Sequence, residues 1–324
     1  MTILVTGSAG FIGYNLCLQL LKNKNNNIIG LDNINNYYDI NLKKDRTKIL
    51  KKNKNFKFKK INLLNVKALR EIFKNNEIQY VVHLAAQAGV RHSIKKPKIY
   101  FKNNLEAFFN ILDLSKDFKI KHFLFASTSS VYGDNNKFPL KEIYNTDKPL
   151  SFYAATKKSN EVIAHSYSYI YNLPCTGLRF FTVYGPYGRP DMALFKFSKN
   201  IIEGKQVELF NNGKHLRDFT YIDDIVNSIL LIIRKPFKNN TPFKIFNIGN
   251  GKSKKLLDYL KEIENNLKMN AKIKKMPLQI GDIVKTHSDV SELMKYSNYK
   301  PKTNIDKGIK KFIKWYKKYY NINN

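Results

Sequence analysis

Cysteine is scarce in this sequence: among 324 residues there are only two, Cys17 and Cys175, and they lie far apart. Two distant cysteines in apolar contexts give no disulfide framework, so we expect reduced core residues of a cytoplasmic protein. Long apolar runs are also missing, since the longest, SILLII at 228–233, is much shorter than the roughly 20 residues of a membrane span. The first residues are predicted to form a strand and a glycine turn, so we expect no signal peptide and no membrane partner.

Acidic residues are few. There are 25 Asp plus Glu against 57 Lys plus Arg, which gives a formal net charge of +32. The lysines are spread over the whole chain, and no helix-turn-helix, zinc-finger or aromatic RNA-binding motif accompanies them, so no nucleic-acid partner is predicted. The charge can still attract an anionic metabolite. The six histidines form no close pair at metal-ligand spacing, so no metal site is predicted.

Short β-branched runs alternate with longer helical patterns through the first half of the chain. This alternation predicts an α/β fold with a doubly wound parallel sheet and helices on both faces. The expected strands are 3–6, 28–32, 56–62, 80–85, 122–127 and 175–180, and the expected helices include 11–23, 66–75, 98–117 and 152–171.

After about residue 185 the alternation becomes irregular, which indicates a smaller C-terminal lobe. We expect residues 1–185 with about 219–248 to form a nucleotide-binding domain, and about 186–218 with 249–324 to form a substrate-binding lobe. A basic last helix over about 305–320 should turn Phe312, Trp315 and Tyr316 inward.

The stretch TGSAGFIG at 6–13 follows the first strand and opens the first helix. Gly7, Gly10 and Gly13 let backbone N–H groups approach a pyrophosphate closely, as in Rossmann-type dinucleotide sites. Asp32 ends the second strand, where a carboxylate can accept bonds from ribose hydroxyls and repels a 2′-phosphate. The neighbouring Asn33 adds no positive charge for that phosphate, so the predicted cofactor is NAD.

A second motif is SFYAATKKSNE at 151–161, where Tyr153 and Lys157 are four residues apart and share one face of a helix. A nearby cation favours phenolate and lowers the pKa of a phenol. Chance is the alternative, because the chain has 20 tyrosines. A hydroxyl cluster, ASTSSVYG at 126–133, ends the fifth strand, where ligands bind in such sheets.

Taken together, these motifs resemble the extended short-chain dehydrogenase/reductase family along nearly the full chain. The resemblance implies that Tyr153 takes the substrate hydroxyl's proton while hydride passes to the nicotinamide. Lys157 would lower the pKa of Tyr153 and bind the nicotinamide ribose, and Thr128 would hydrogen-bond the reacting oxygen. Besides the glycines, Asp32, Asn33, Tyr153 and Lys157, it implies these cofactor-binding residues: Phe11, Ile12, Asn62, Leu63, Leu84, Ala85, Ala86, Gln87, Asn103, Ser127 and Phe180. Asn62 replaces a usual acid but can still bond adenine.

The subfamilies differ in the step that comes after oxidation at C4 of a nucleotide sugar. Dehydratases and decarboxylases carry acids where this chain has Ser129 and Ser130, which do not titrate near neutrality. Long stretches, including LRFFTVYGPYGRPDMALFKF at 178–197 and RDFTYIDDI at 217–225, resemble bacterial UDP-glucuronate 4-epimerases and capsule biosynthesis proteins. The alternatives are UDP-glucose or UDP-N-acetylglucosamine 4-epimerases, a UDP-glucuronate decarboxylase, and a non-catalytic NAD-binding protein.

The resemblance also implies a set of substrate contacts. Arg189 would bind the glucuronate carboxylate bidentately, and Arg217 would contact the diphosphate; a surface arginine and a structural ion pair are the alternatives. Gln279 replaces a common arginine in a segment that closes over the nucleotide. The whole expected set is Arg91, Thr128, Ser129, Ser130, Tyr153, Thr182, Arg189, Leu194, Phe210, Arg217, Gln279 and Asp282. A homodimer would form through a four-helix bundle of 98–117 and 152–171.

Overall fold

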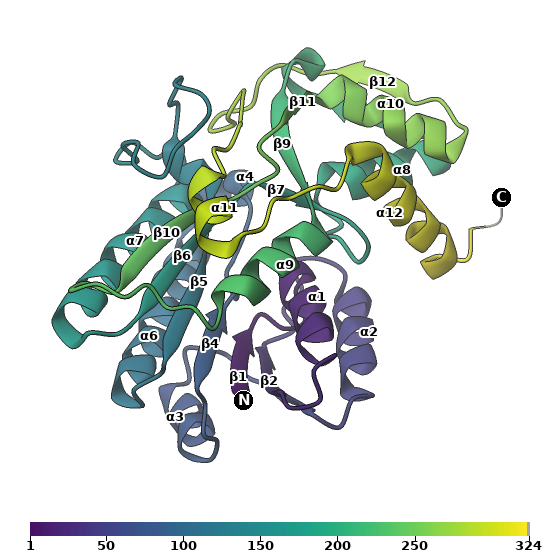
Figure 1. Ribbon diagram of the computed structural model, residues 1–324. Helices are drawn as coiled ribbons and strands as arrows, with labels where there is room; N and C mark the ends of the chain where they lie inside the picture. The colour runs from purple at the N-terminus through teal and green to yellow at the C-terminus, as the bar shows by residue number, and fades with distance from the viewer. Residues whose placement is uncertain (323–324) are drawn as a thin grey trace.

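The structure is a computed structural model that describes residues 1–322, and its centre is a parallel sheet (Figure 1). Within these residues the sheet has seven strands in the order β10-β6-β5-β4-β1-β2-β3. The strands are β1 (Thr2–Thr6), β2 (Asn27–Asp32), β3 (Phe56–Lys60), β4 (Tyr80–His83), β5 (His122–Thr128), β6 (Cys175–Phe180) and β10 (Phe243–Ile248). All neighbouring pairs are parallel, so their carboxyl ends meet at one edge.

Both faces of this sheet are covered by helices, because alternate side chains of each buried strand point to opposite sides. Ile3 and Val5 of β1 pack in one apolar cluster, whereas Leu4 between them packs in the other. The first cluster includes residues of α1 (Phe11–Leu20), α2 (Ile40–Lys51) and α9 (Ile222–Ile232). The second includes residues of α3 (Val66–Lys74), α6 (Ala107–Asp117) and α7 (Phe152–Tyr171). The predicted Rossmann-type, doubly wound sheet is confirmed.

The region expected as one helix over 98–117 is divided into three. It consists of α5 (Pro97–Tyr100), a π-helical turn η1 (Phe101–Glu106) and α6. Asn104 lies inside the π-helical turn and is buried, and its amide exchanges hydrogen bonds with the backbone of Gln87 (2.7 and 3.0 Å). The turn therefore brings a polar side chain from a helix to the loop that follows β4.

The second lobe lies beyond the carboxyl edge of the sheet (Figure 1). It contains a three-stranded sheet of β7 (Thr182–Tyr184), β9 (Leu216–Tyr221) and β11 (Ser253–Lys255), and a pair of β8 (Gln206–Leu209) with β12 (Lys272–Lys275). Its helices are α8 (Ala193–Ile202), α10 (Leu256–Leu267) and α12 (Ile305–Tyr319). Short turns complete the chain: α4 (Val90–Lys95), η2 (Ser129–Tyr132), η3 (Phe210–Gly213) and α11 (Ser291–Ser297).

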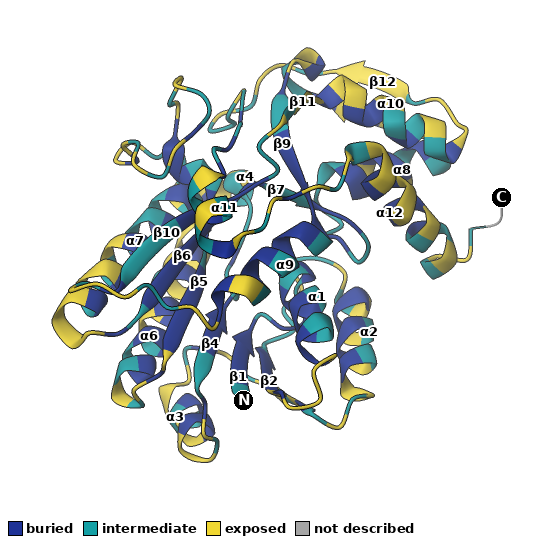
Figure 2. Cartoon of the chain, viewed as in Figure 1, coloured by how far each residue is buried: buried dark blue, intermediate teal, exposed yellow. Residues whose placement is uncertain are grey.

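Helix α12 is amphipathic, as expected for the basic last helix. Phe312 and Tyr316 are buried, and Trp315 packs against Tyr187 in a tilted arrangement with ring centroids 4.8 Å apart. Exposed residues, chiefly lysines, cover the other side of the helix (Figure 2). The apolar face thus holds α12 against the lobe, and the positive charge faces solvent.

The chain enters the second lobe and then returns to the central sheet. Helix α9 and strand β10 come after β7, α8, β8 and β9, yet α9 packs in the cluster of α1 and β10 pairs with β6. Cys17 and Cys175 are both buried and unpaired, as expected. Within residues 1–322, no helix is both long and apolar enough to cross a membrane.

Candidate active site

The glycine loop lies where the carboxyl ends of β1 and β4 meet. A Cβ on Gly7 would lie 2.8 Å from the backbone nitrogen of Ala85, and one on Gly13 would lie 2.2 Å from the carbonyl oxygen of Gly7. Helix α1 begins at Phe11 with no side-chain cap on its first N–H groups. Such N–H groups bind anions, so the loop fits the pyrophosphate of a dinucleotide.

Asp32 ends β2 beside this loop. Its carboxylate accepts hydrogen bonds from the backbone N–H groups of Ala9 (3.1 Å) and Ile34 (2.8 Å). Burial raises the pKa of Asp32 above the ordinary value, and these two bonds oppose the shift. A carboxylate fixed in this way at the end of β2 suits ribose hydroxyls.

Other residues expected at the cofactor lie in loops at the same edge. Leu84, Ala85, Ala86 and Gln87 directly follow β4. Asn62 follows β3, and its side chain accepts a bond from the N–H of Leu64 (3.1 Å), which fixes its own loop. Asn33 directly follows Asp32, and Leu63 is buried beside α6, where its carbonyl accepts a bond from Asn110.

Asn103 and Asn104, the two neighbouring asparagines of the π-helical turn, differ in burial and in hydrogen-bond partners. Asn103, which was expected to line the cofactor, donates to the carbonyl of Ile99 (2.8 Å). Asn104 is the buried one, and it also donates to the hydroxyl of Thr156 on α7 (3.1 Å). The sequence NN gives no sign of which asparagine points inward, because the helix there is π-helical rather than α-helical.

Tyr153 and Lys157 stand on the first turns of α7, whose N-terminus is capped by Ser151 (3.2 Å to the N–H of Ala154). Lys157 is buried, and its ammonium donates to the carbonyl of Ala126 on β5 (2.9 Å). Thr128 ends β5 and is close enough to Tyr153 to lower its pKa. The helix and the strand end therefore bring together the three residues expected to be catalytic.

The surroundings act on the pKa of Tyr153 in opposite directions. Burial raises that pKa, and the groups that oppose the shift are Thr128 and Arg189. Burial also lowers the pKa of Lys157 to about 8, against the effect of Glu161. The Lys157 ammonium is directed at β5, so its expected effect on the pKa of Tyr153 stays a prediction.

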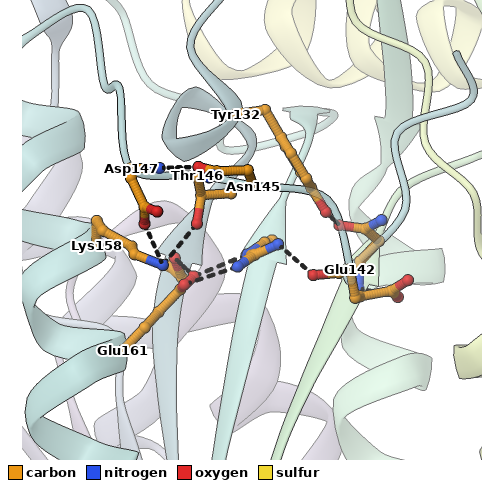
Figure 3. Close-up of polar contacts among 10 residues, drawn as sticks. Tyr132, Glu142, Asn145, Thr146, Asp147, Lys158 and Glu161 are labelled. Atoms are coloured by element: carbon orange, nitrogen blue, oxygen red, sulfur yellow. Dashed lines mark hydrogen bonds and ion pairs between the residues drawn. The ribbon is translucent and has the colours of Figure 1, made fainter. Parts of the chain in front are cut away.

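Glu161, labelled in Figure 3, belongs to a buried ion pair next to β5. Glu161, two turns after Tyr153 on α7, accepts two hydrogen bonds from Arg179 on β6 (2.9 and 2.8 Å) and one from Ser127 on β5 (2.6 Å). Arg179 also donates to the carbonyl of Glu142 (3.2 Å) and lies over the ring of Tyr132 (4.8 Å to the centroid). Sequence reasoning missed the Glu161–Arg179 pair, because Arg179 lies inside an otherwise apolar strand pattern.

The substrate side begins with Arg189, which follows β7. Its guanidinium grips Asp191 in a bidentate pair (3.0 and 2.5 Å), and Tyr37 donates to the same carboxylate (3.3 Å). Burial acts to raise the pKa of Asp191, but Arg189 outweighs it and holds that pKa below the ordinary value. Arg189 is thus close enough to influence Tyr153, and its fork already holds a carboxylate.

A second cluster of polar and charged side chains surrounds Asp282, and it joins β9 of the second lobe to helix α4. Asp282 faces Arg217 (3.2 Å), Arg91 (3.6 Å) and His215 (3.4 Å). The guanidinium of Arg91 also lies over the ring of Phe210 (4.5 Å to the centroid). Two residues expected at the substrate, Arg91 and Arg217, thus share one carboxylate, and Arg217 has the acidic neighbour that was its alternative explanation. Two guanidinium groups around one carboxylate leave net positive charge, which suits a diphosphate.

The remaining expected residues lie in several different elements. Ser129 and Ser130 form η2 directly after Thr128, whose hydroxyl donates to that of Ser130 (3.2 Å). Phe180 ends β6, Thr182 begins β7, and Leu194 is buried in α8. The carboxamide oxygen of Gln279 is buried and has no hydrogen-bond partner within residues 1–322. Hydroxyl groups, rather than acids, thus surround Thr128.

Comparisons with known proteins agree with this geometry. The model of the NAD dependent epimerase/dehydratase family matches residues 3–249. Protein CapI of Staphylococcus aureus is 47% identical, with 99% of each chain covered. UDP-glucuronate 4-epimerase 4 of Arabidopsis thaliana is 43% identical over 99% of this chain and 76% of its own. A crystal structure of UDP-glucuronic acid 4-epimerase from Bacillus cereus, in complex with UDP-glucuronic acid and NAD, has a TM-score of 0.92 and 34% identity, with 99% of this chain and 100% of that chain covered.

Proposed function

The chain belongs to the NAD dependent epimerase/dehydratase family, and from this premise we propose that it is a UDP-glucuronate 4-epimerase. It interconverts UDP-glucuronate and UDP-galacturonate and uses NAD as its cofactor. The observation that carries this proposal is the bidentate grip of Arg189 on a carboxylate, beside the half-buried Tyr153. Asp191 occupies Nε and one terminal nitrogen of Arg189, so a uronate carboxylate would bind the other terminal nitrogen or replace Asp191 on the fork.

The chain's own residues handle the proton of the C4 hydroxyl. NAD, held by the glycine loop and Asp32, would supply a hydride acceptor for C4 from which the hydride can return to the other face of the C4 ketone. Tyr153 accepts the hydroxyl proton, and Thr128 and Arg189 favour the phenolate that this requires. Lys157 adds positive charge one turn away on the same face of α7.

The residues after Thr128 exclude two competing outcomes. Elimination of a hydroxyl and assisted loss of CO2 both need a titratable acid at the reacting sugar, and Ser129 and Ser130 occupy those positions. The 4-keto form of glucuronate is a β-keto acid, which loses CO2 readily when the bond to the carboxylate stands perpendicular to the carbonyl plane. Arg189, Thr182, Ser129 and Ser130 hold the carboxylate away from that alignment.

The diphosphate binds at the second cluster. Arg217 and Arg91 there share a single carboxylate, Asp282, so both can turn part of their hydrogen-bonding capacity to phosphate oxygens. Epimerisation requires the ketone to rotate in its pocket. Most of the binding energy must therefore come from the UDP portion of the substrate, which does not move.

A direct assay tests the proposed function. The NAD-loaded protein is incubated with UDP-glucuronate, and the nucleotide sugars are separated and identified by NMR. We expect UDP-galacturonate from the wild type and none from Tyr153→Phe. Turnover of UDP-glucose without turnover of UDP-glucuronate would establish the alternative epimerase, and UDP-pentose as the main product would establish a decarboxylase.

The protein also has a surface that fits a second copy of itself. Exposed apolar side chains lie on α6 and α7, at Phe109, Val162, Tyr169 and Ile170. Exposed apolar patches of this kind mark interaction sites. A homodimer in which α6 and α7 of two subunits form a four-helix bundle would cover them. We propose a cytoplasmic location, which suits the two buried, unpaired cysteines Cys17 and Cys175.

A further inference from the structure

Arg46 on α2 is completely buried, yet it forms no ion pair with a carboxylate of residues 1–322. Its guanidinium donates only to neutral oxygen atoms. A buried charge is expensive unless it is paired, and an apolar side chain could fill the same volume. The burial of the Arg46 charge therefore needs a reason, and the groups that its guanidinium bonds supply one.

The guanidinium joins two loops that carry the site. One terminal nitrogen donates to the carbonyl of Ala9 in the glycine loop (2.8 Å) and to the hydroxyl of Tyr38 (2.8 Å). The other donates to the carbonyls of Tyr187 (2.6 Å) and Gly188 (3.1 Å), directly before Arg189. One side chain thus bonds the loop that fits NAD and the loop that carries the expected carboxylate-binding arginine.

The backbone is held in a specific conformation at both places that Arg46 bonds, Ala9 and Tyr187. Ala9 also donates its N–H to Asp32, which is expected at the ribose. Tyr187 has a φ of +57°, a left-handed conformation that a bulky side chain adopts only when its surroundings impose it. The bonds from Arg46 therefore help to fix the backbone that places Arg189.

We propose that Arg46 is a positioning residue that couples the two ligands, so that NAD and UDP-glucuronate strengthen each other's binding. The proposal rests on the proposed function, because the second ligand is a UDP-uronate. A hydrogen-bonded series runs from Asp32 through Ala9 and Arg46 to the backbone of Tyr187 and Gly188. When a ligand orders one loop, the bonds of Arg46 also order the other loop. The second ligand then loses less conformational entropy when it binds.

Equilibrium binding tests the coupling. The dissociation constant of NAD is measured for protein depleted of NAD, with and without saturating UDP-glucuronate, in a Tyr153→Phe background that prevents turnover. We expect UDP-glucuronate to tighten NAD binding at least fivefold when Arg46 is present. In Arg46→Met the ratio should fall to near one, and by reciprocity NAD should no longer tighten UDP-glucuronate.

Three further variants separate coupling from loss of stability. Arg46→Lys keeps a charge but cannot bond both loops, so it should also lose most of the coupling, and it serves if Arg46→Met does not fold. Tyr38→Phe removes only the phenol acceptor, and Trp315→Phe loosens the packing on Tyr187; both should keep the wild-type ratio even if Tm falls.

The result that overturns the coupling is a ratio unchanged in Arg46→Met or Arg46→Lys, or a ratio of one already in the Tyr153→Phe parent. This failure is distinct from failure of the proposed function. That function is judged separately, by the product that the wild-type enzyme forms from UDP-glucuronate.

Discussion

Arg189 is placed to do two things at once. It favours the phenolate of Tyr153, and its fork grips a carboxylate, Asp191, in the bidentate manner expected for a uronate. The same guanidinium can then hold the substrate carboxylate away from the perpendicular alignment that promotes loss of CO2. Arg189 would therefore both bind the uronate carboxylate and prevent loss of CO2 from the 4-keto intermediate.

Replacing Arg189 should change the products as well as the rate. In Arg189→Ala we expect kcat/KM for UDP-glucuronate to fall at least tenfold and the share of released UDP-pentose to rise, because the carboxylate is no longer held. Chromatography of the nucleotide sugars measures both, with Arg217→Ala as the control that weakens binding without freeing the carboxylate. Turnover of Arg189→Ala without extra UDP-pentose would contradict the protective role.

The Glu161–Arg179 pair should matter far more for stability than ion pairs at the surface. Replacing Glu161 with Gln leaves Arg179 buried with its charge uncompensated, and breaking a buried pair costs about 3–5 kcal/mol. Asp117→Asn is the matched control, because Asp117 and Arg70 form a partly exposed pair of the kind that contributes about 0–1 kcal/mol. Urea unfolding compares the two variants, and equal losses would show that burial of the Glu161 pair is unimportant.

Single residues show what the sequence could predict. The glycines, Asp32, Tyr153 and Lys157 follow from spacing, because a helix or a strand end fixes where such residues point. Asp191, Asn104, Arg46 and the Glu161–Arg179 pair were not predicted. The partners of Asn104, Arg46 and the Glu161–Arg179 pair are distant in the chain, and Asp191 lies in a loop whose conformation the sequence pattern does not specify. Lysines and arginines are also so frequent in this sequence that a functional one does not stand out.

At the scale of elements, the loop between β1 and α1 is the most constrained. The pattern of strand, glycines and helix was predictable from sequence, and the structure shows why small residues are needed: at Gly7 and Gly13 a side chain would collide with backbone. The π-helical turn at 101–106 was not predictable, since its apolar spacing is that of an ordinary helix.

Adding a single methyl group to this loop should abolish cofactor binding. In Gly13→Ala the new Cβ would lie 2.2 Å from the carbonyl oxygen of Gly7, so the loop must move away from its position. We expect NAD affinity to fall at least a hundredfold, as measured by the amount of NAD that remains with the purified protein and by titration. Gly204→Ala is the control, because its positive φ adds strain of about 1–2 kcal/mol without a nearby atom; it should lower Tm but retain NAD.

The whole molecule carries a net charge of +32, yet α6 and α7 together expose several large apolar side chains, including Phe109, Val162 and Tyr169. Charge keeps copies of the chain apart, so association must come from such an apolar face, where burial gains roughly 25 cal/mol per Å². The proposed four-helix bundle would use this face and would leave the lysines of α12 in solvent (Figure 2).

A charge on that face should separate the subunits. In Val162→Glu we expect a monomer by light scattering, because a carboxylate would be buried at the centre of the bundle. Met269→Glu, at an exposed apolar position in the other lobe, should leave the mass of a dimer unchanged. A wild-type protein that is monomeric at all concentrations would contradict the dimer.

The return of the chain to the central sheet limits how the molecule can be cut. A fragment that ends near residue 185 would contain the glycine loop, Tyr153 and Lys157, but it would lack α9, which covers α1, and β10, which pairs with β6. The apolar side of α1 and one edge of the sheet would face water. Expression of the first 185 residues alone should therefore give insoluble material, and a minimal cofactor-binding unit would have to splice residues 219–248 back onto that fragment.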